Sequence, residues 1–250
     1  VARGMERASA VVVLNDRVTG HPRAFMEGSI ISKQRTAASA ALASKVLAAA
    51  EPDVIGFVGC GPINVSVAQF LASSWPGVRQ FMAFDLDPDR SLAFGERLCE
   101  HIPGAVCTTA ASLEALLSDC LMVSFGTTAI KPYVENLDAS PAGATILHVS
   151  LRDLSAGTVL SNHNIVDDLD HVNRAATSIH LASTQAGNTD FVHGSLGDLL
   201  LGNVELPERD ERKMIFSPFG LGVLDLAVAD MVQRTIANEG GGTVIESFLP

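Results

Sequence analysis

The sequence of 250 residues is short of aromatic and of charged side chains. Only 5% of its residues are aromatic, with one tryptophan and one tyrosine, and 18% are charged, against about a quarter in typical soluble domains. Acidic residues outnumber basic ones by 28 to 17, and the formal net charge of −11 argues against binding to nucleic acid or anionic lipid. No apolar run reaches the ~18 residues that a membrane span needs, and no signal peptide opens the chain.

Metal and nucleophile motifs are also missing. The four cysteines (Cys60, Cys99, Cys107 and Cys120) have spacings that match no zinc or redox motif, so we expect free, reduced thiols in a cytoplasmic protein. No pair of histidines, cysteines or carboxylates has metal-ligand spacing, and we predict no metal site. The sequence has no Gly-x-Ser-x-Gly elbow, and no Ser-His-Asp arrangement can be argued from it.

What the chain does contain is a regular alternation of short apolar runs and helical stretches. Hydrophobic residues make up 47% of it, and with so few aromatics the core is built from Ala, Val, Leu and Ile, as in buried parallel sheets. Alternation of this kind predicts a doubly wound parallel α/β sheet. We expect strands at Val54–Val58, Phe81–Phe84, Ala105–Thr108, Cys120–Phe125, Thr145–Val149, Asn164–Val166 and Met214–Ser217, and helices at Asn64–Ser73, Pro88–His101 and Ser112–Leu117.

The first of these strands ends in a glycine turn, Gly59-Cys60-Gly61, and the second ends in Asp85, 24 positions after Gly61. In a dinucleotide site the first glycine makes the tight turn, the second lets backbone N–H groups approach the pyrophosphate, and the helix N-terminus favours negative charge. A carboxylate after the second strand accepts the ribose hydroxyls and repels a 2′-phosphate, which favours NAD over NADP. We therefore predict that Gly59, Gly61, Pro62, Ile63, Asn64 and Asp85 bind NAD. The alternative is an ordinary βα turn, because Asn64 occupies the third glycine position and is expected to crowd the helix against the strand.

Two further regions flank the sheet. Ser9–Asn15 and Pro22–Met26 predict a β-hairpin, and the pattern from Gly28 to Ala50 is helical. After Met214–Ser217 we expect a helix at Val223–Ala237 and a final strand at Thr243–Phe248 that returns to the first sheet.

Several segments together resemble the ornithine cyclodeaminase/μ-crystallin family, in order along nearly the whole chain. They are Arg35-Thr36-Ala37-Ala38, Gly59-Cys60-Gly61, Gly126-Thr127-Thr128, Gly197-Asp198-Leu199-Leu200-Leu201-Gly202 and Gly220-Leu221-Gly222-Val223-Leu224-Asp225. Three more segments are most similar to the branch of this family that makes 2,3-diaminopropionate. They are Arg7–Asp16, His148–Leu154 and Ser217–Gly222.

The resemblance implies a Rossmann-type NAD-binding domain over residues 51–215, a substrate and dimerisation domain of which residues 1–50 are a remnant, and a C-terminal helix and strand in 216–250 that return to it. It also implies a homodimer. The implied reaction is the NAD-dependent oxidation of N-(2-amino-2-carboxyethyl)-L-glutamate, which yields 2,3-diaminopropionate and 2-oxoglutarate. The diamino acid would then be a precursor of siderophores or peptide antibiotics. The family further implies an upstream segment with a catalytic lysine. None of Lys33, Lys45, Lys131 or Lys213 stands where that lysine is expected, so we expect a truncated or clipped chain.

Asp153 aligns with the family's catalytic aspartate, and Arg35 is the best candidate for a carboxylate clamp, because a guanidinium meets a carboxylate through two parallel hydrogen bonds. The alternatives are that Asp153 is a loop or N-cap residue or an ion-pair partner of Arg152, and that Arg35 pairs with a structural acid or is solvated. By resemblance, Thr36, Thr127, Thr128, Ser217, Gly220 and Leu221 lie at the cofactor; plain loops are the alternative. His148 is nearest the proposed site, and a buried histidine bonded to backbone is its commoner role.

Other functions remain open at this stage. Ornithine cyclodeamination, in which NAD is reduced and reoxidised within one turnover, and a ketimine or opine-type reduction are enzymatic alternatives. A crystallin-like nucleotide-binding or ligand-binding protein without catalysis is an alternative of another class.

Overall fold

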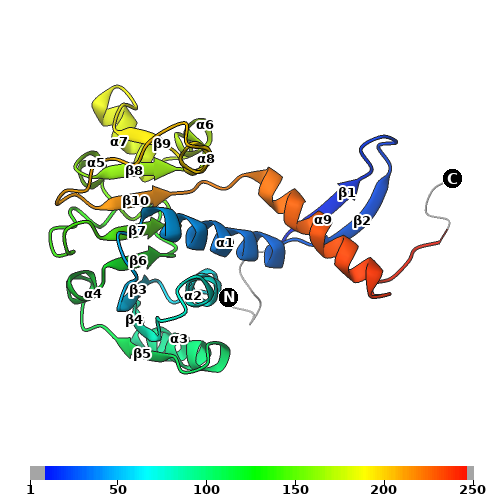
Figure 1. The fold of residues 1–250 in the computed structure, drawn as a ribbon, viewed down its shortest axis with the longest axis horizontal. Helices are drawn as coiled ribbons and strands as arrows, with labels where there is room; N and C mark the ends of the chain where they lie inside the picture. The colour runs from blue at the N-terminus through cyan, green and yellow to red at the C-terminus, as the bar shows by residue number, and fades with distance from the viewer. Residues whose placement is uncertain (1–8, 247–250) are drawn as a thin grey trace. The chain divides into compact units, whose positions relative to one another are not determined.

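The computed structural model describes residues 9–246, which form two compact units (Figure 1). Within the described residues, one unit combines residues 9–35 with 221–246, and the other runs from Thr36 to Gly220. The larger unit holds the sheet and most of the candidate site, and the smaller unit holds a hairpin and two helical segments.

The larger unit is built on an eight-stranded sheet in which every pair of neighbours is parallel. Chain order reverses between β3 and β6, and the carboxyl ends of the strands at such a reversal are the usual ligand position in doubly wound sheets. This is the predicted Rossmann-type architecture. In spatial order the strands are β5 (Val106–Thr109), β4 (Gln80–Phe84), β3 (Val54–Val58), β6 (Met122–Phe125), β7 (Thr145–His148), β10 (Met214–Ser217), β8 (His163–Val166) and β9 (Val192–Ser195).

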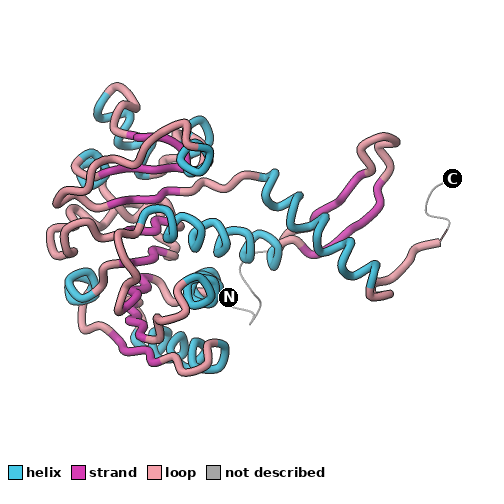
Figure 2. The backbone as a smooth tube through the Cα atoms, viewed as in Figure 1, coloured by secondary structure: helices cyan, strands magenta, loops and turns pink. Residues whose placement is uncertain are grey.

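Helices cover both faces of the sheet, as Figure 2 shows. Successive side chains of a strand point to opposite faces, so Met214 and Phe216 of β10 join one core cluster and Ile215 joins the other. The first cluster includes residues of α1 (Ser29–Leu47), α2 (Pro62–Ser74), α3 (Pro88–His101) and α8 (Leu196–Leu201). The second includes residues of α4 (Leu113–Asp119), α5 (Ala156–Leu160), α6 (Leu169–Val172) and α7 (Ser178–Ala186).

The smaller unit pairs β1 (Val11–Asn15) with β2 (Pro22–Glu27) in an antiparallel hairpin and adds α9 (Gly222–Asn238). The hairpin turn is fixed by Asp16, whose carboxylate accepts the backbone N–H groups of Val18 and Thr19 at 3.0 and 2.8 Å. Leu14, Ile31 and Ala229 form its small buried core. None of the helices within residues 9–246 is both long and apolar enough to cross a bilayer.

Most expected elements are found within one to three residues of their predicted bounds, including the hairpin and the C-terminal helix. The sequence pattern missed β9, a short outer strand of Val-His-Gly-Ser without an apolar run. The final strand expected at Thr243–Phe248 is wrong over residues 243–246, which are exposed and unpaired after the glycine-rich turn at 240–242. Residues 247 and 248 lie outside the described part of the chain.

Candidate functional site

The glycine turn lies at the carboxyl end of β3, directly beside the end of β6. Gly59 has a φ of +85°, and a Cβ there would meet the carbonyl oxygen of Gly126 at 2.7 Å, so no other residue fits. Gly61 caps α2 without a side-chain hydrogen bond, and an added Cβ would find its nearest neighbour, Gly126 O, only at 4.0 Å. The N-terminus of α2 is therefore open on this side and fits a pyrophosphate.

Asn64 is accommodated and does not crowd the helix, which corrects the expectation drawn from the sequence. Its side chain is fully buried, and its amide nitrogen donates to the carbonyls of Gly59 and Val58 at 2.7 and 3.1 Å. Its amide oxygen accepts the hydroxyl of Ser124 at 2.8 Å. The space comes from Gly126, where a Cβ would stand 2.7 Å from the Asn64 amide carbon. The close approach of helix and strands therefore depends on a glycine in the facing loop.

Asp85 follows β4 and is tied to the same turn. One carboxylate oxygen accepts the N–H of Cys60 at 2.9 Å, and the other accepts the N–H of Asp87 at 3.2 Å. The guanidinium of Arg90 lies 3.6 Å from the first oxygen, and the Asp85 side chain is 11% exposed. The carboxylate thus holds the turn in place while it keeps an edge open to a ligand.

A second group of polar side chains surrounds Asp153, which is fully buried after β7. Thr127 and Tyr133 donate their hydroxyls to one carboxylate oxygen, and Ser150 and His148 contact the other. None of these partners is an arginine, and Ser155, not Asp153, caps α5. Asp153 is therefore neither a simple N-cap nor an ion-pair partner of Arg152, whose guanidinium donates to the carbonyl of Ala175 at 2.9 Å.

The backbone between His148 and Asp153 makes an unusual turn. Leu151 has a φ of +68°, in the left-handed region that costs a residue with a Cβ roughly 1–2 kcal/mol. Its carbonyl is fixed by the N–H of Ser178 at 2.8 Å, and the N–H of Ser150 is bound by the carbonyl of Phe125 at 3.0 Å. Strain of this kind persists where the surroundings hold it, and it is common at functional sites. Here the turn carries the Asp153 carboxylate back to His148.

The electrostatics of this cluster favour an ionised carboxylate. Burial would raise the pKa of Asp153, but the hydrogen bond and charge of His148, with the hydroxyls of Ser150 and Thr127, hold its pKa below the ordinary value. Burial of the Tyr133 hydroxyl, followed by the negative charge of Asp153, raises the pKa of that phenol. The site therefore presents a buried carboxylate base with hydroxyl donors around it.

His148 connects this cluster to the end of β10. The ring is fully buried; Nε2 lies 3.2 Å from the carboxylate of Asp153, and Nδ1 lies 3.2 Å from the hydroxyl of Ser217. Ser217 begins a turn whose Phe219 and Gly220 N–H groups bind the carboxylate of Asp167 at 2.9 and 2.6 Å. His148 thus bonds mainly to side chains. This differs from the commoner role of a buried histidine, which bonds to backbone.

Of the remaining candidates in the larger unit, Thr128 and Ile63 are exposed, while Pro62 opens α2 and Thr36 is half-buried in α1. Thr128 follows Thr127 in the loop after β6, but only Thr127 of the two contacts Asp153 by a hydrogen bond in the described residues. The structure thus brings Gly59, Gly61, Asn64 and Thr127 to one pair of strand ends.

Arg35 and Leu221 belong to the smaller unit. The Nε of Arg35 donates to the carboxylate of Asp225 at 3.1 Å, and Nη2 donates to the hydroxyl of Ser32 at 3.3 Å. The Arg35 side chain is only 16% exposed. Arg35 therefore does pair with a structural acid, which was one of the alternatives drawn from the sequence. That acid is Asp225, and it binds the Nε edge of the guanidinium. Leu221 precedes α9 as its N-cap residue, without a side-chain hydrogen bond.

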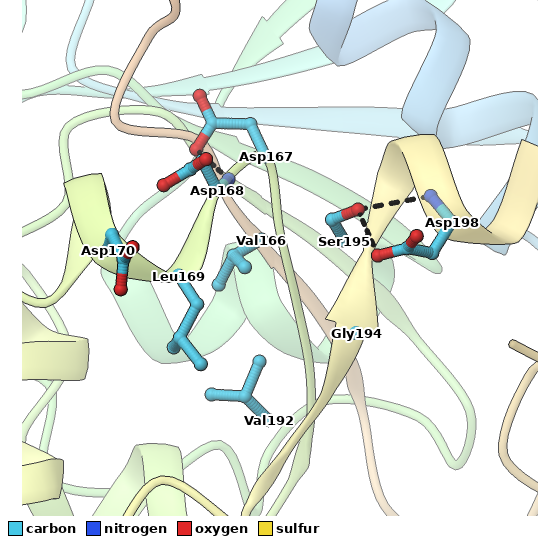
Figure 3. Close-up of a pocket in the computed structure, with 9 residues that line it drawn as sticks. All are labelled: Val166, Asp167, Asp168, Leu169, Asp170, Val192, Gly194, Ser195 and Asp198. Atoms are coloured by element: carbon cyan, nitrogen blue, oxygen red, sulfur yellow. Dashed lines mark hydrogen bonds between the residues drawn. The ribbon is translucent and has the colours of Figure 1, made fainter. Parts of the chain in front are cut away.

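A cavity of about 330 Å³ lies at the carboxyl ends of β8 and β9 (Figure 3). Its acids serve the local backbone: Asp168 accepts the N–H of His171 at 2.9 Å, Asp198 accepts the hydroxyl of Ser195 at 2.7 Å, and Asp167 binds the turn after Ser217. Of the carboxylates shown in Figure 3, that of Asp168 caps α6 and that of Asp198 bonds to the serine that caps α8, while Asp170 is exposed. The lining residues are Val166, Asp167, Asp168, Leu169, Asp170, Val192, Gly194, Ser195 and Asp198.

The sequence interpretation did not assign Tyr133 or Asp167 to this region, and it included Gly126 and Ser150 only within segments that resemble the family, without a role of their own. Gly126 and Asp167 directly follow strands, and the rule that ligands lie at the carboxyl ends of parallel strands points to them. No comparable signal marks Tyr133 or Ser150, because their contacts with Asp153 depend on loop conformations.

The parallel sheet, its reversal point and the glycine turn define a Rossmann-type α/β protein. The model of the ornithine cyclodeaminase/mu-crystallin family matches residues 1–240, and the chain belongs to that family. The resemblance seen in the sequence is therefore confirmed.

Three similar proteins are informative. N-((2S)-2-amino-2-carboxyethyl)-L-glutamate dehydrogenase of Staphylococcus aureus is 27% identical over 248 residues, which are 98% of this chain and 74% of that protein. The crystal structure of CmnK has a TM-score of 0.89 at 27% identity, covering 100% of this chain and 74% of CmnK. An archaeal alanine dehydrogenase dimer with bound NAD has a TM-score of 0.87 at 26% identity, covering 99% and 77%. The two dehydrogenases among these relatives support the conclusion that this chain is an oxidoreductase of the family.

Proposed function

We propose that this protein is an NAD-dependent oxidoreductase that oxidises the C–N bond of an amino-acid-derived secondary amine. One observation carries the proposal, a continuous path of contacts from the glycine turn to a buried carboxylate. Gly59 abuts Gly126, Thr127 follows Gly126, and the hydroxyl of Thr127 donates to Asp153. The base is therefore attached to the loop that borders the cofactor turn.

NAD fits the residues at the strand ends. The open N-terminus of α2 at Gly61 and the Gly59–Asn64 turn receive the pyrophosphate, and Asp85 receives the ribose hydroxyls. We assign Thr127, Thr128 and the Ser217–Leu221 turn to the nicotinamide end, and Thr36 to the cofactor as well. The archaeal alanine dehydrogenase that is similar to this chain contains NAD, which supports the assignment. When bound, NAD supplies the hydride acceptor.

The residues of this chain would supply the rest of the chemistry. Oxidation of a secondary amine removes a hydride from carbon and a proton from nitrogen, and it leaves an imine that water hydrolyses. Asp153, ionised and buried, is the group that takes the proton or activates the water. Arg35 is the proposed clamp for a substrate carboxylate, through the guanidinium edge that Asp225 does not occupy.

For the substrate, we favour N-(2-amino-2-carboxyethyl)-L-glutamate, which yields 2,3-diaminopropionate and 2-oxoglutarate, a precursor supply for siderophores or peptide antibiotics. Support comes from the S. aureus dehydrogenase of that substrate, 27% identical over 98% of this chain, and from the His148–Leu154 segment that the sequence singled out. A homodimer is part of the proposal, since the similar archaeal alanine dehydrogenase is a dimer and Phe25 of the hairpin is 74% exposed.

A substrate panel tests this function. Purified full-length protein is incubated with NAD and, separately, with the glutamate adduct, L-ornithine, L-alanine and L-proline. We expect NADH to accumulate only with the adduct, in equal amounts with 2,3-diaminopropionate and 2-oxoglutarate measured by mass spectrometry. Proline formation from ornithine without net NADH would replace the proposal with cyclodeamination. NADH from alanine would make the protein an alanine dehydrogenase, and NAD binding without turnover of any amine would favour a non-catalytic role.

A further inference from the structure

His148 has a partner at each of its ring nitrogens, which is uncommon for a buried histidine with only a packing role. Nε2 faces the Asp153 carboxylate and the Asp153 backbone N–H, both at 3.2 Å, and Nδ1 faces the Ser217 hydroxyl at 3.2 Å. The ring itself is held edge-on against Phe125, with centroids 6.3 Å apart and an interplanar angle of 89°. Its orientation is thereby fixed while both nitrogens remain engaged.

These contacts satisfy the ring in either neutral tautomer. With hydrogen on Nε2, the ring donates to Asp153 and accepts the Ser217 hydroxyl at Nδ1. With hydrogen on Nδ1, the ring donates to Ser217 and Nε2 accepts the backbone N–H of Asp153, or the proton of a protonated Asp153 carboxyl. Ser217 is 1% exposed, so its hydroxyl can turn between donor and acceptor roles without competition from bulk water.

We propose that His148 is a positioning residue that acts with Asp153 as one proton-holding pair, and that the Ser217 hydroxyl supports the ring at Nδ1 in either tautomer and when the ring is protonated. The inference rests on the proposed amine oxidation. In that reaction the C–H bond breaks with its electron pair going to the hydride acceptor, the N–H proton goes to Asp153, and a C=N bond forms. The added proton is then held either as a neutral Asp153 carboxyl bonded to Nε2 or as a carboxylate facing an imidazolium.

The other groups around the pair do not supply this function. Tyr133 is the other titratable side chain that bonds to Asp153 in residues 9–246, and its raised pKa keeps the phenol a donor. Asp85 acts on Tyr133 only through its charge, and Arg152 is directed to the carbonyl of Ala175. Thr127 and Ser150 are hydroxyl donors without a transferable charge. Within this cluster, His148 is thus the one side chain that can hold the proton taken from the amine together with the Asp153 carboxylate.

The variant H148Q tests the pair, because an amide still donates to Asp153 but takes up no proton. We expect kcat to fall about 10- to 100-fold, while the KM for amine and the Kd for NAD stay near wild type. His148 lowers the pKa of Asp153 through its hydrogen bond, which the glutamine amide keeps, and through its charge, which glutamine lacks, so the pKa of Asp153 rises in H148Q. The acid limb of the kcat/KM profile therefore moves to higher pH.

H171Q is the matched control, since His171 forms an exposed histidine–aspartate pair with Asp168, at 2.8 Å, away from Asp153. H171Q should retain the wild-type kcat and pH profile. An H148Q enzyme with the same kcat and acid limb as H171Q would overturn the proposal.

A second readout needs neither substrate nor cofactor. The carbon-13 carboxyl signal of Asp153, assigned by its absence in D153N, should titrate at higher pH in H148Q and also in S217A, which leaves the ring in place. If circular dichroism shows that H148Q does not fold, S217A decides the matter, and an unshifted Asp153 titration there would contradict the pair. Failure of every amine to react would remove the proposed function while this titration still reported on the pair.

Discussion

Asp85 shows how one side chain serves both the structure of the turn and the proposed choice of cofactor. Its carboxylate holds the N–H of Cys60 at 2.9 Å, so removal of the whole side chain disturbs the turn as well as the ribose site. An asparagine keeps an oxygen acceptor for that N–H but loses the charge. The pair D85N and D85A therefore separates the two roles, and Arg90 at 3.6 Å would then be available to a 2′-phosphate.

We predict that D85N raises the Kd for NAD roughly 10- to 100-fold, the loss expected for a charge-assisted hydrogen bond to a ribose hydroxyl. The Kd for NADP should stay level or fall, because repulsion is removed. Isothermal titration calorimetry with both cofactors gives the comparison, with D89N as the control, since Asp89 is an exposed acid of the same segment. An unchanged preference for NAD in D85N would remove Asp85 from the ribose site.

Among the secondary-structure elements, the turn after β10 connects the cluster around Asp153 to the end of β8. Ser217 lies on it and reaches His148, while its Phe219 and Gly220 N–H groups are bound by Asp167 from the end of β8. Gly220 has a φ of +103°, which is accessible mainly to glycine. The conformation of this turn is therefore set by one carboxylate and one glycine.

We expect D167N to loosen this turn, because an amide nitrogen would replace one of the two oxygens that accept its N–H groups. The unfolding free energy should fall by about 1.5–3 kcal/mol, as for a hydrogen bond to a charged group, and NAD affinity should fall with it. Chemical denaturation and cofactor titration measure both quantities. D170N, which alters an exposed acid of the same cavity, should leave both unchanged. Wild-type stability and affinity in D167N would show that the turn keeps its shape without the carboxylate.

At the scale of the whole molecule, the sequence predicted what depends on local pattern. Apolar runs and glycine turns located the parallel strands, and the spacing from Gly61 to Asp85 placed the acid after β4. Contacts between loops that are far apart in sequence could not be predicted from local pattern. Asn64 was expected to crowd the helix because its partner glycine, Gly126, lies 62 positions away in sequence and becomes its neighbour only in the fold. Tyr133, a partner of Asp153 from a loop 20 positions away, was missed for the same reason.

The smaller unit shows the same limit. Arg35 was singled out as a carboxylate clamp with a structural acid as one alternative, and the structure places Asp225, 190 positions later, against it. Pattern alone indicated a partner but did not identify it. Binding of a substrate carboxylate by the same guanidinium is part of the proposed function.

The central claim is that the buried carboxylate of Asp153 is the base of an NAD-dependent amine oxidation. Its most direct test is single-turnover NADH formation by D153N and wild type with the glutamate adduct, at matched cofactor saturation. D153N keeps the size of the side chain, and we predict an unchanged Kd for NAD with a rate lowered about 10²- to 10⁴-fold, as expected for loss of a general base. A D153N rate within about threefold of wild type, with the same products, would contradict the account.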